Sequence, residues 1–221
     1  MGAMTTWYLV RSLVGIHVAG RLLDYEEEFR VIATDDALRA QREARQIAKQ
    51  EHQPYNNPFG ETVHWKLDQV TEVSPLDVPE PTDGTWLYSR SYPRVSRIDQ
   101  RDADRVEITR GSARAPRGEA YWYGAMLLFR LREPHPHEQE RLLLFRAGSY
   151  FQAKRRALAM GVRHAAKSDG AFVGLFDVVD LFDAEIQSGT EVYWRFYRPG
   201  LIKDKSRPPR QLRWITVPEL V

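Results

Sequence analysis

The sequence predicts an α+β protein made of two tandem ββαββ repeats with mainly antiparallel sheets. The main observation is a nine-residue pattern, G-T-x-(L/V)-Y-x-R-x-Y, which occurs at residues 84–92 and returns at residues 189–197. The second observation is that strand-like and helix-like segments precede both copies in the same order. We expect the pattern to close each repeat as its last strand. Because a single unit of roughly 80 residues has a small core, we expect the two units to pack as an intramolecular pseudo-dimer.

Each repeat is expected to open with two strands and to continue with a helix. The first strand is apolar on both faces, which is typical of a strand covered on both sides. The predicted strand pairs are 7–14 with 28–33, and 122–129 with 141–146. Thr34 or Asp35 is the predicted N-cap of the first helix, and Ser149 that of the second. The predicted inner stripes are rich in small residues: Ala37, Ala40, Ala44, Ile47 and Ala48, then Ala153, Ala157, Met160 and Ala165.

A third strand is predicted before each closing strand, at residues 63–73 and 172–181. The predicted organisation of the chain is a first repeat at 5–92, a charged linker at 93–120, a second repeat at 121–198 and a basic, proline-containing tail at 199–221. A short strand at 106–109 is expected inside the linker. Apolar residues near the end of the tail, such as Trp214 and Ile215, predict that part of it docks on the folded protein.

Composition excludes several classes of protein. Cysteine is absent, so disulfides, thiolate metal sites and cysteine nucleophiles are excluded. There is no run of about 18 apolar residues and no signal-peptide pattern. We therefore expect a cytoplasmic protein with no membrane association and no cofactor.

Charge is distributed unevenly along the chain. Residues 1–92 hold 9 Lys/Arg and 14 Asp/Glu, whereas residues 121–221 hold 16 Lys/Arg and 11 Asp/Glu. The halves therefore have opposite net charge, −5 and +5. Either the two halves dock on each other, or the basic half offers a surface to an acidic partner.

The second repeat resembles the bacterial domain-of-unknown-function family 4288. The resemblance rests on W-Y-x-A-x-L-L-F at residues 122–129, on the alanine-spaced helix, and on G-T-E-V-Y-x-R-F at residues 189–196. The first repeat resembles the family as a divergent copy, because it keeps Trp7, Tyr8 and the closing pattern but has longer loops. The resemblance implies a small α+β unit and a bacterial source, and it implies no reaction.

The closing strands carry the clearest candidate binding residues. Alternation along a strand places tyrosine, arginine and tyrosine on one face of each. These residues are Tyr88, Arg90 and Tyr92 in the first repeat and Tyr193, Arg195 and Tyr197 in the second. The two faces either stabilise the fold or form a recognition surface for a protein or an anion, since Tyr and Arg are enriched at binding hot spots.

The helices carry the second set of candidates, a series of basic residues. Lys154, Arg155 and Arg156 are the candidate binding residues of the second helix for phosphates or an acidic partner, although such runs are also typical of solvated helix faces. No nucleic-acid motif accompanies them.

Signals for catalysis or metal binding are weak. Phosphate-binding, dinucleotide-binding, nucleophile-elbow and zinc-protease motifs are all missing from the sequence. His135 and His137 flank Pro136, too few ligands for a zinc site. The run Glu26–Glu28 is interpreted as a charged strand edge that discourages aggregation. We predict no catalytic and no metal-binding residues.

The function that these observations favour is a non-enzymatic interaction protein. Bacterial proteins of this size and composition with no evident chemistry include immunity, antidote and defence-accessory proteins, an argument by analogy. The alternative is a protein that binds nucleic acid or a nucleotide through the basic second repeat and tail. The expected partner is a protein in the first case; oligomeric state is left open.

Overall fold

The structure is a computed structural model that describes residues 5–93, 120–131, 137–168, 170–181, 185–188, 190–197 and 215–216. The chain divides into two compact units, Met1–Glu80 with Ile186–Arg210, and Pro81–Glu185 with Gln211–Val221, here called unit 1 and unit 2. Each unit has one five-stranded sheet and one helix, and the strand pairs of the described residues are antiparallel. The predicted α+β class with antiparallel sheets is confirmed.

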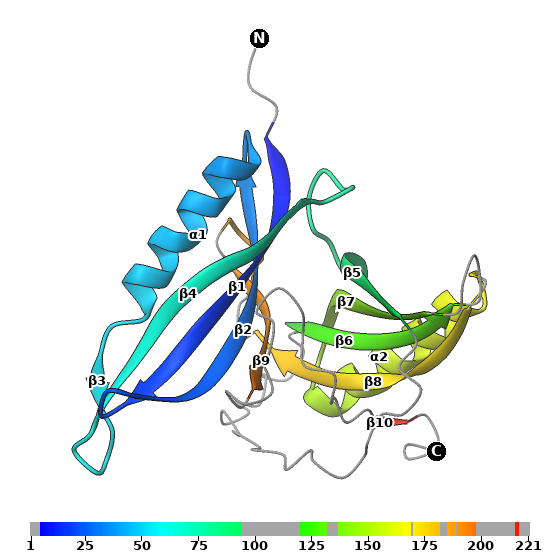
Figure 1. Ribbon diagram of the computed structural model, residues 1–221. Helices are drawn as coiled ribbons and strands as arrows, with labels where there is room; N and C mark the ends of the chain where they lie inside the picture. Colours follow the sequence, from blue (N-terminus) through cyan, green and yellow to red (C-terminus); the bar gives the residue numbers. More distant parts are fainter. Residues whose placement is uncertain are drawn as a thin grey trace. The chain divides into compact units, whose positions relative to one another are not determined.

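Unit 1 is a sheet with the strand order β3-β4-β1-β2-β9 and one covering helix. Figure 1 shows the helix α1 lying along one face of this sheet. The elements are β1 (Thr6–Val18), β2 (Arg21–Thr34), α1 (Ala37–Glu51), β3 (Tyr55–Asn56), β4 (Thr62–Pro75) and β9 (Glu191–Tyr197). The long first hairpin turns at Ala19 and Gly20, which both have positive φ, as a two-residue hairpin turn with right-handed twist requires.

Unit 2 repeats this plan with the strand order β10-β8-β6-β7-β5. Its elements are β5 (Thr85–Pro93), β6 (Tyr121–Leu131), β7 (His137–Ala147), α2 (Tyr150–Ala165), β8 (Gly170–Asp180) and β10 (Ile215–Thr216). Ile215 and Thr216 pair with Leu175 and Gly174 of β8, which confirms that part of the tail docks on a folded unit.

The two closing strands are exchanged between the units, and this corrects the expected assignment. β5, the closing strand of the first repeat, pairs with β7 in unit 2. β9, the closing strand of the second repeat, pairs with β2 in unit 1. The prediction that each closing strand completes the sheet of its own repeat is therefore wrong. The physical reason is that β2 and β7 offer equivalent residues at the positions where a closing strand pairs. The residue pattern of a closing strand therefore does not distinguish the sheet of unit 1 from that of unit 2.

Each helix begins at a side-chain cap and packs through small residues. Asp36 caps α1 by accepting a hydrogen bond from the backbone N–H of Arg39 (2.8 Å), so the predicted caps Thr34 and Asp35 are one or two residues early. Ser149 caps α2 as predicted, accepting from the N–H of Gln152 at 3.2 Å. The residues buried against the sheets are Ala40, Ala44 and Ala48 in α1, and Ala153, Ala157 and Gly161 in α2. These small side chains let each helix approach its sheet closely.

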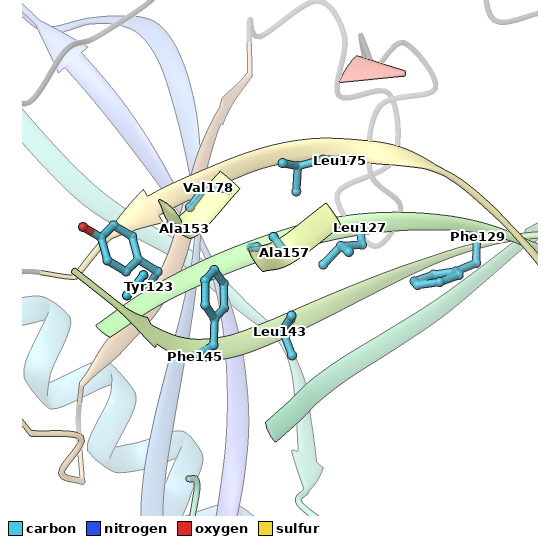
Figure 2. Close-up of a cluster of buried hydrophobic side chains, with 11 residues drawn as sticks. Tyr123, Leu127, Phe129, Leu143, Phe145, Ala153, Ala157, Leu175 and Val178 are labelled. Atoms are coloured by element: carbon cyan, nitrogen blue, oxygen red, sulfur yellow. The ribbon is translucent and has the colours of Figure 1, made fainter. Parts of the chain in front are cut away.

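The helix-covered face of each sheet forms a hydrophobic core. In unit 2 the core joins aromatic and aliphatic residues of β6, β7 and β8 to α2 (Figure 2), with Tyr123, Leu127, Phe129, Leu143, Phe145 and Leu175 among its members. In unit 1 the matching cluster contains Tyr8, Val10 and Ile32 beneath α1. The opposite faces are apolar and buried as well, for example at Leu9, Val31, Leu142 and Leu144. This explains why the first strand of each repeat is apolar on both faces.

Several predictions fall on residues outside the described part of the chain. They are the linker at residues 94–119 with its expected strand at 106–109, His135 and Pro136, Gly189, and the tail except for residues 215–216.

Candidate interaction surface

The predicted Tyr-Arg-Tyr residues lie on β5 and β9, the two closing strands. Tyr88 and Tyr193 are both buried. Tyr193 lies opposite Phe29 in the register of unit 1, where their rings meet edge to face at 5.6 Å. Tyr88 lies opposite Leu142 in unit 2. These two tyrosines therefore contribute to the interior of their units, and their role in recognition stays a prediction.

The arginines of the closing strands have matching positions in the two sheets. Arg195 lies in register with Glu27, and Arg90 lies in register with Glu140. Both glutamates are buried, Glu140 completely. The side chains of Arg90, Tyr92, Arg195 and Tyr197 lie outside the described part of the structure.

The acidic run Glu26–Glu28 lies inside the sheet of unit 1. β2 is an inner strand between β1 and β9, and all three glutamates are at most 4% exposed. Their interpretation as a charged strand edge is therefore wrong. The helix that follows β2 and the exchanged strand β9 together cover what the sequence suggested was an edge.

Glu28 and Arg30 form the centre of a buried ionic cluster beneath the C-terminal end of α1. The guanidinium of Arg30 lies 3.3 Å from Glu28, 2.6 Å from Glu51 and 3.6 Å from Glu191. The Nε2–H of His52 donates to Glu28 at 2.9 Å. Strand β2, helix α1 and strand β9 each supply part of the cluster, so the exchanged strand helps to close it.

The charges of this cluster compensate one another. Burial raises the pKa of the Glu28 carboxyl group, but the hydrogen bond from His52 and the positive charge of Arg30 outweigh burial and hold that pKa below its ordinary value of 4.5. On the helix-free face, Arg11 lies 2.7 Å from Glu27 and 3.4 Å from Glu72. Because each buried charge has an opposite charge within reach, we interpret both groups as structural.

Among the residues that the structure describes, no group of three or more potential ligands could hold a metal ion. In the ionic cluster of unit 1 the pKa of the Glu28 carboxyl group is lowered, whereas a general acid at neutral pH would need a raised pKa. The prediction that the sequence carries no catalytic or metal-binding residues stays a prediction.

The predicted basic residues of α2 have two different environments. Arg156 is tied to the fold, because it pairs with Asp83 at 2.8 Å and donates to the backbone carbonyl of Arg146. Lys154 and Arg155 lie over aromatic rings of their own helix: the ammonium is 4.7 Å from the ring of Tyr150, and the guanidinium is 5.9 Å from that of Phe151. Lys154 and Arg155 thus remain candidates for binding, whereas Arg156 has a structural role.

Exposed apolar residues accompany these cations on α2, on either side of half-buried Leu158, which also packs against the core of unit 2. Phe151 is 68% exposed and Val162 is 50% exposed, with Arg155 and half-buried Leu158 between them. The spacing of 4, 3 and 4 residues aligns these four side chains along the helix axis. We call Phe151, Arg155, Leu158 and Val162 the α2 stripe.

Three of the four counterpart positions in α1 are polar. Counted from the N-caps Asp36 and Ser149, the counterparts of the α2 stripe in α1 are Leu38, Arg42, Arg45 and Lys49. Only the first is apolar. α2 also has no acidic residue between Tyr150 and Lys167, whereas α1 has Glu43 and Glu51. Our sequence interpretation missed Phe151 and Val162; the comparison of the two helices from their caps is the signal that finds them.

Comparison with known proteins supports the family for one part of the chain. Residues 7–89 match the family model described as Domain of unknown function (DUF4288). The match lies on the repeat that we expected to be the divergent copy, and the membership of the second repeat stays a prediction. No curated protein and no solved structure matches the chain. Neither of the described helices is long and apolar enough to cross a membrane.

Proposed function

We propose that this protein is a non-enzymatic interaction module and that the α2 stripe is its recognition surface. The observation that carries this proposal is the difference between the two helices: the repeat keeps the inner residues of α2 small and buried, yet its outer side is apolar where α1 is polar. Large exposed apolar side chains beside arginine are typical of protein–protein binding sites.

The charge around the stripe indicates an acidic partner. Lys154, Arg155, Arg163 and Lys167 are the charged residues of this helix that lie outside the ion pair with Asp83, and all are positive. Such a surface attracts an acidic partner and disfavours a basic one. The partner that we propose is therefore a protein with an apolar segment bordered by Asp and Glu.

Binding of nucleic acid is the second candidate, favoured by the cation–aromatic pairs Lys154–Tyr150 and Arg155–Phe151. Aromatic rings and cations on one surface also bind single-stranded nucleic acid by stacking and phosphate contact. The two candidates differ in their dependence on salt. For binding through phosphate contacts, the logarithm of the binding constant falls steeply and linearly with the logarithm of the salt concentration, whereas binding through an apolar protein contact persists at high salt.

The experiment compares two matched double variants. Phe151→Ser with Arg155→Glu alters the stripe, and Leu38→Ser with Arg42→Glu makes the same changes at the counterpart positions of α1. We expect purification from the native host to recover a stoichiometric protein partner with the wild type and with the α1 variant, but not with the α2 variant. Recovery with the α2 variant as well contradicts the stripe as the binding surface. Retention on single-stranded nucleic acid that is lost at high salt assigns the surface to the second candidate.

We further propose that the protein acts in the bacterial cytoplasm as an immunity, antidote or defence-accessory protein. The family resemblance, the lack of cysteine and the interaction surface support this role by analogy. The second repeat is proposed to be a diverged copy of the family domain. The apolar helix-free faces favour packing of the two halves as a pseudo-dimer.

A further inference from the structure

Arg141 occupies an unusual position on β7, on the helix-covered face of the sheet in unit 2. Its Nε–H donates to Gln139 at 2.6 Å, and its Nη1 is hydrogen-bonded to Nε2 of His164 in the last turn of α2. The guanidinium also lies 5.5 Å from the ring centre of Phe129, which marks one end of the core cluster in Figure 2. The side chain is thus held in place by neutral groups on three sides.

No carboxylate pairs with Arg141 within the described part of the chain. Burial lowers the pKa of its guanidinium, and no neighbouring anion opposes that effect. The counterpart of Arg141 in unit 1 is Glu28, at the same distance from the helix cap, and there Arg30 and His52 compensate the charge. Unit 1 therefore balances the charge at this position internally, whereas the described residues of unit 2 supply no opposite charge to half-buried Arg141.

The surroundings of Arg141 are aromatic and electropositive. The Trp86 and His164 rings are 4.7 Å apart, and Phe129 lies 5.2 Å from His164. Burial, followed by the charges of Arg141 and Lys167, lowers the pKa of His164. His164 is consequently neutral at pH 7, accepts from Arg141 through Nε2 and carries its proton on Nδ1, where it is a further donor.

We infer that Arg141, His164 and Trp86 form a binding site for a small organic oxyanion, a carboxylate or phosphate attached to a flat ring. A guanidinium has five N–H groups, and the hydrogen bonds to Gln139 and His164 use two of those on Arg141, so among the described residues Nη2 is left to donate. Half-buried Trp86 packs against the core beside His164, and the proposal is that a flat group stacks on the part of this ring that stays exposed, while exposed Lys167 adds positive charge. The site is separate from the α2 stripe and does not depend on the function proposed for it.

Calorimetric titration of the full chain tests this site with three probes at constant ionic strength: benzoate, adenosine monophosphate and inorganic phosphate. We expect one of the ring-bearing anions to bind once per chain, with a dissociation constant of roughly 1 mM or below, and more tightly than inorganic phosphate. Preference for benzoate identifies a carboxylate ligand, and preference for the nucleotide identifies a phosphate ligand. The absence of saturation by both ring-bearing anions overturns the proposal.

Variants separate binding from a structural role of Arg141. Arg141→Gln and Trp86→Leu are expected to weaken binding at least tenfold, while the exposed control Arg42→Gln leaves it unchanged. In chloride buffer Arg141→Gln is expected to melt no lower than the wild type, because the uncompensated charge adds no ion pair. Substituting phosphate for chloride should raise the melting temperature of the wild type by more than that of Arg141→Gln, because phosphate stabilises both proteins in a general way and the wild type also by binding. Two results together would contradict the site: Arg141→Gln melts lower than the wild type in chloride, and both Arg141→Lys and Trp86→Leu retain anion binding. Arg141 would then have a structural role in the fold.

Discussion

Units 1 and 2 share one fold but differ in how they use the space between the sheet and the end of the helix. In unit 1 Glu28, Arg30 and His52 form a closed network of opposite charges. In unit 2 the counterpart of Glu28 is Arg141, and its neighbours are Phe129 and His164. The outer helix faces differ in the same sense, because α1 is polar where α2 carries the apolar stripe. The contrast teaches that unit 1 pairs opposite charges at this position of the sheet, whereas in unit 2 we propose that a ligand supplies the counter-charge.

The largest effect on stability is expected from a mutation in one of the exchanged closing strands. Tyr193 belongs to the second repeat in sequence but is completely buried in unit 1. Tyr193→Ala is expected to destabilise unit 1 by about 3–5 kcal/mol, because it removes a large buried aromatic side chain. Hydrogen exchange read by mass spectrometry should show lost protection in β1, β2 and α1, with β6, β7 and α2 unaffected.

The counterpart variant supplies the control for the exchange. Tyr88 lies early in the chain but in unit 2, so Tyr88→Ala should reduce protection in β6 and β7 and spare β1 and β2. Loss of protection within the same repeat that carries the mutation, in either variant, contradicts the exchange.

Replacement of Glu28 by Gln is expected to have the next largest effect, about 2–3 kcal/mol, since it removes a buried charge that accepts charge-assisted hydrogen bonds. The folded-state pKa of Glu28 lies below its ordinary value of 4.5. Its contribution to stability is therefore fully present above the unfolded pKa and is lost as pH falls through the lower folded pKa.

Urea unfolding measured from pH 7 to pH 3 tests the Glu28 prediction. The wild type should lose stability below about pH 4.5, and Glu28→Gln should lose less over the same interval. Arg42→Gln, a change at an exposed position of α1, should leave the acid dependence as in the wild type. Equal acid dependence in wild type and Glu28→Gln contradicts the assigned role of the carboxylate.

The sequence predicted the order of strands and helices well, but not which strands pair. Binary patterns and caps are local, so the cap Ser149 and most of the inner alanines were predicted correctly, although Ala37 of the predicted stripe is exposed. Strand exchange depends on the pairing of β9 with β2 and β5 with β7, and Phe29 and Leu142 offer equivalent partners to Tyr193 and Tyr88. The buried ions were missed for a related reason: an acidic run such as Glu26–Glu28 indicates solvent exposure unless its counter-charges, which come from distant strands, are known.

A smaller effect is expected where the two helices approach their sheets. Gly161 and Ala48 are counterparts from the N-caps, and both are buried. A Cβ atom on Gly161 would lie 2.6 Å from the ring of Phe172 and 2.9 Å from Leu127. Gly161→Ala is therefore expected to destabilise unit 2 by about 1–3 kcal/mol through overpacking, although alanine favours a helix.

The reverse substitution in unit 1 provides the control. Ala48→Gly should cost only about 1 kcal/mol, the ordinary difference in helix propensity with a small loss of packing. Thermal unfolding of both variants measures the two costs. If Gly161→Ala stabilises the protein, the approach of α2 to β6 and β8 is looser than the structure indicates.

The smallest effect is expected in the β1–β2 turn, where unit 1 carries a local strain. Ala19 has a φ of 49°, in the left-handed region that an alanine side chain disfavours, next to Gly20 with a φ of 80°. Asparagine tolerates this region better, so Ala19→Asn should stabilise unit 1 by less than about 1 kcal/mol. Hydrogen exchange should show the gain in β1 and β2 alone, and Gly20→Ala should show a loss in the same strands. An equal gain in β6 and β7 would mean that the two units unfold as one cooperative body, so that differences measured in one unit could no longer be assigned to it separately.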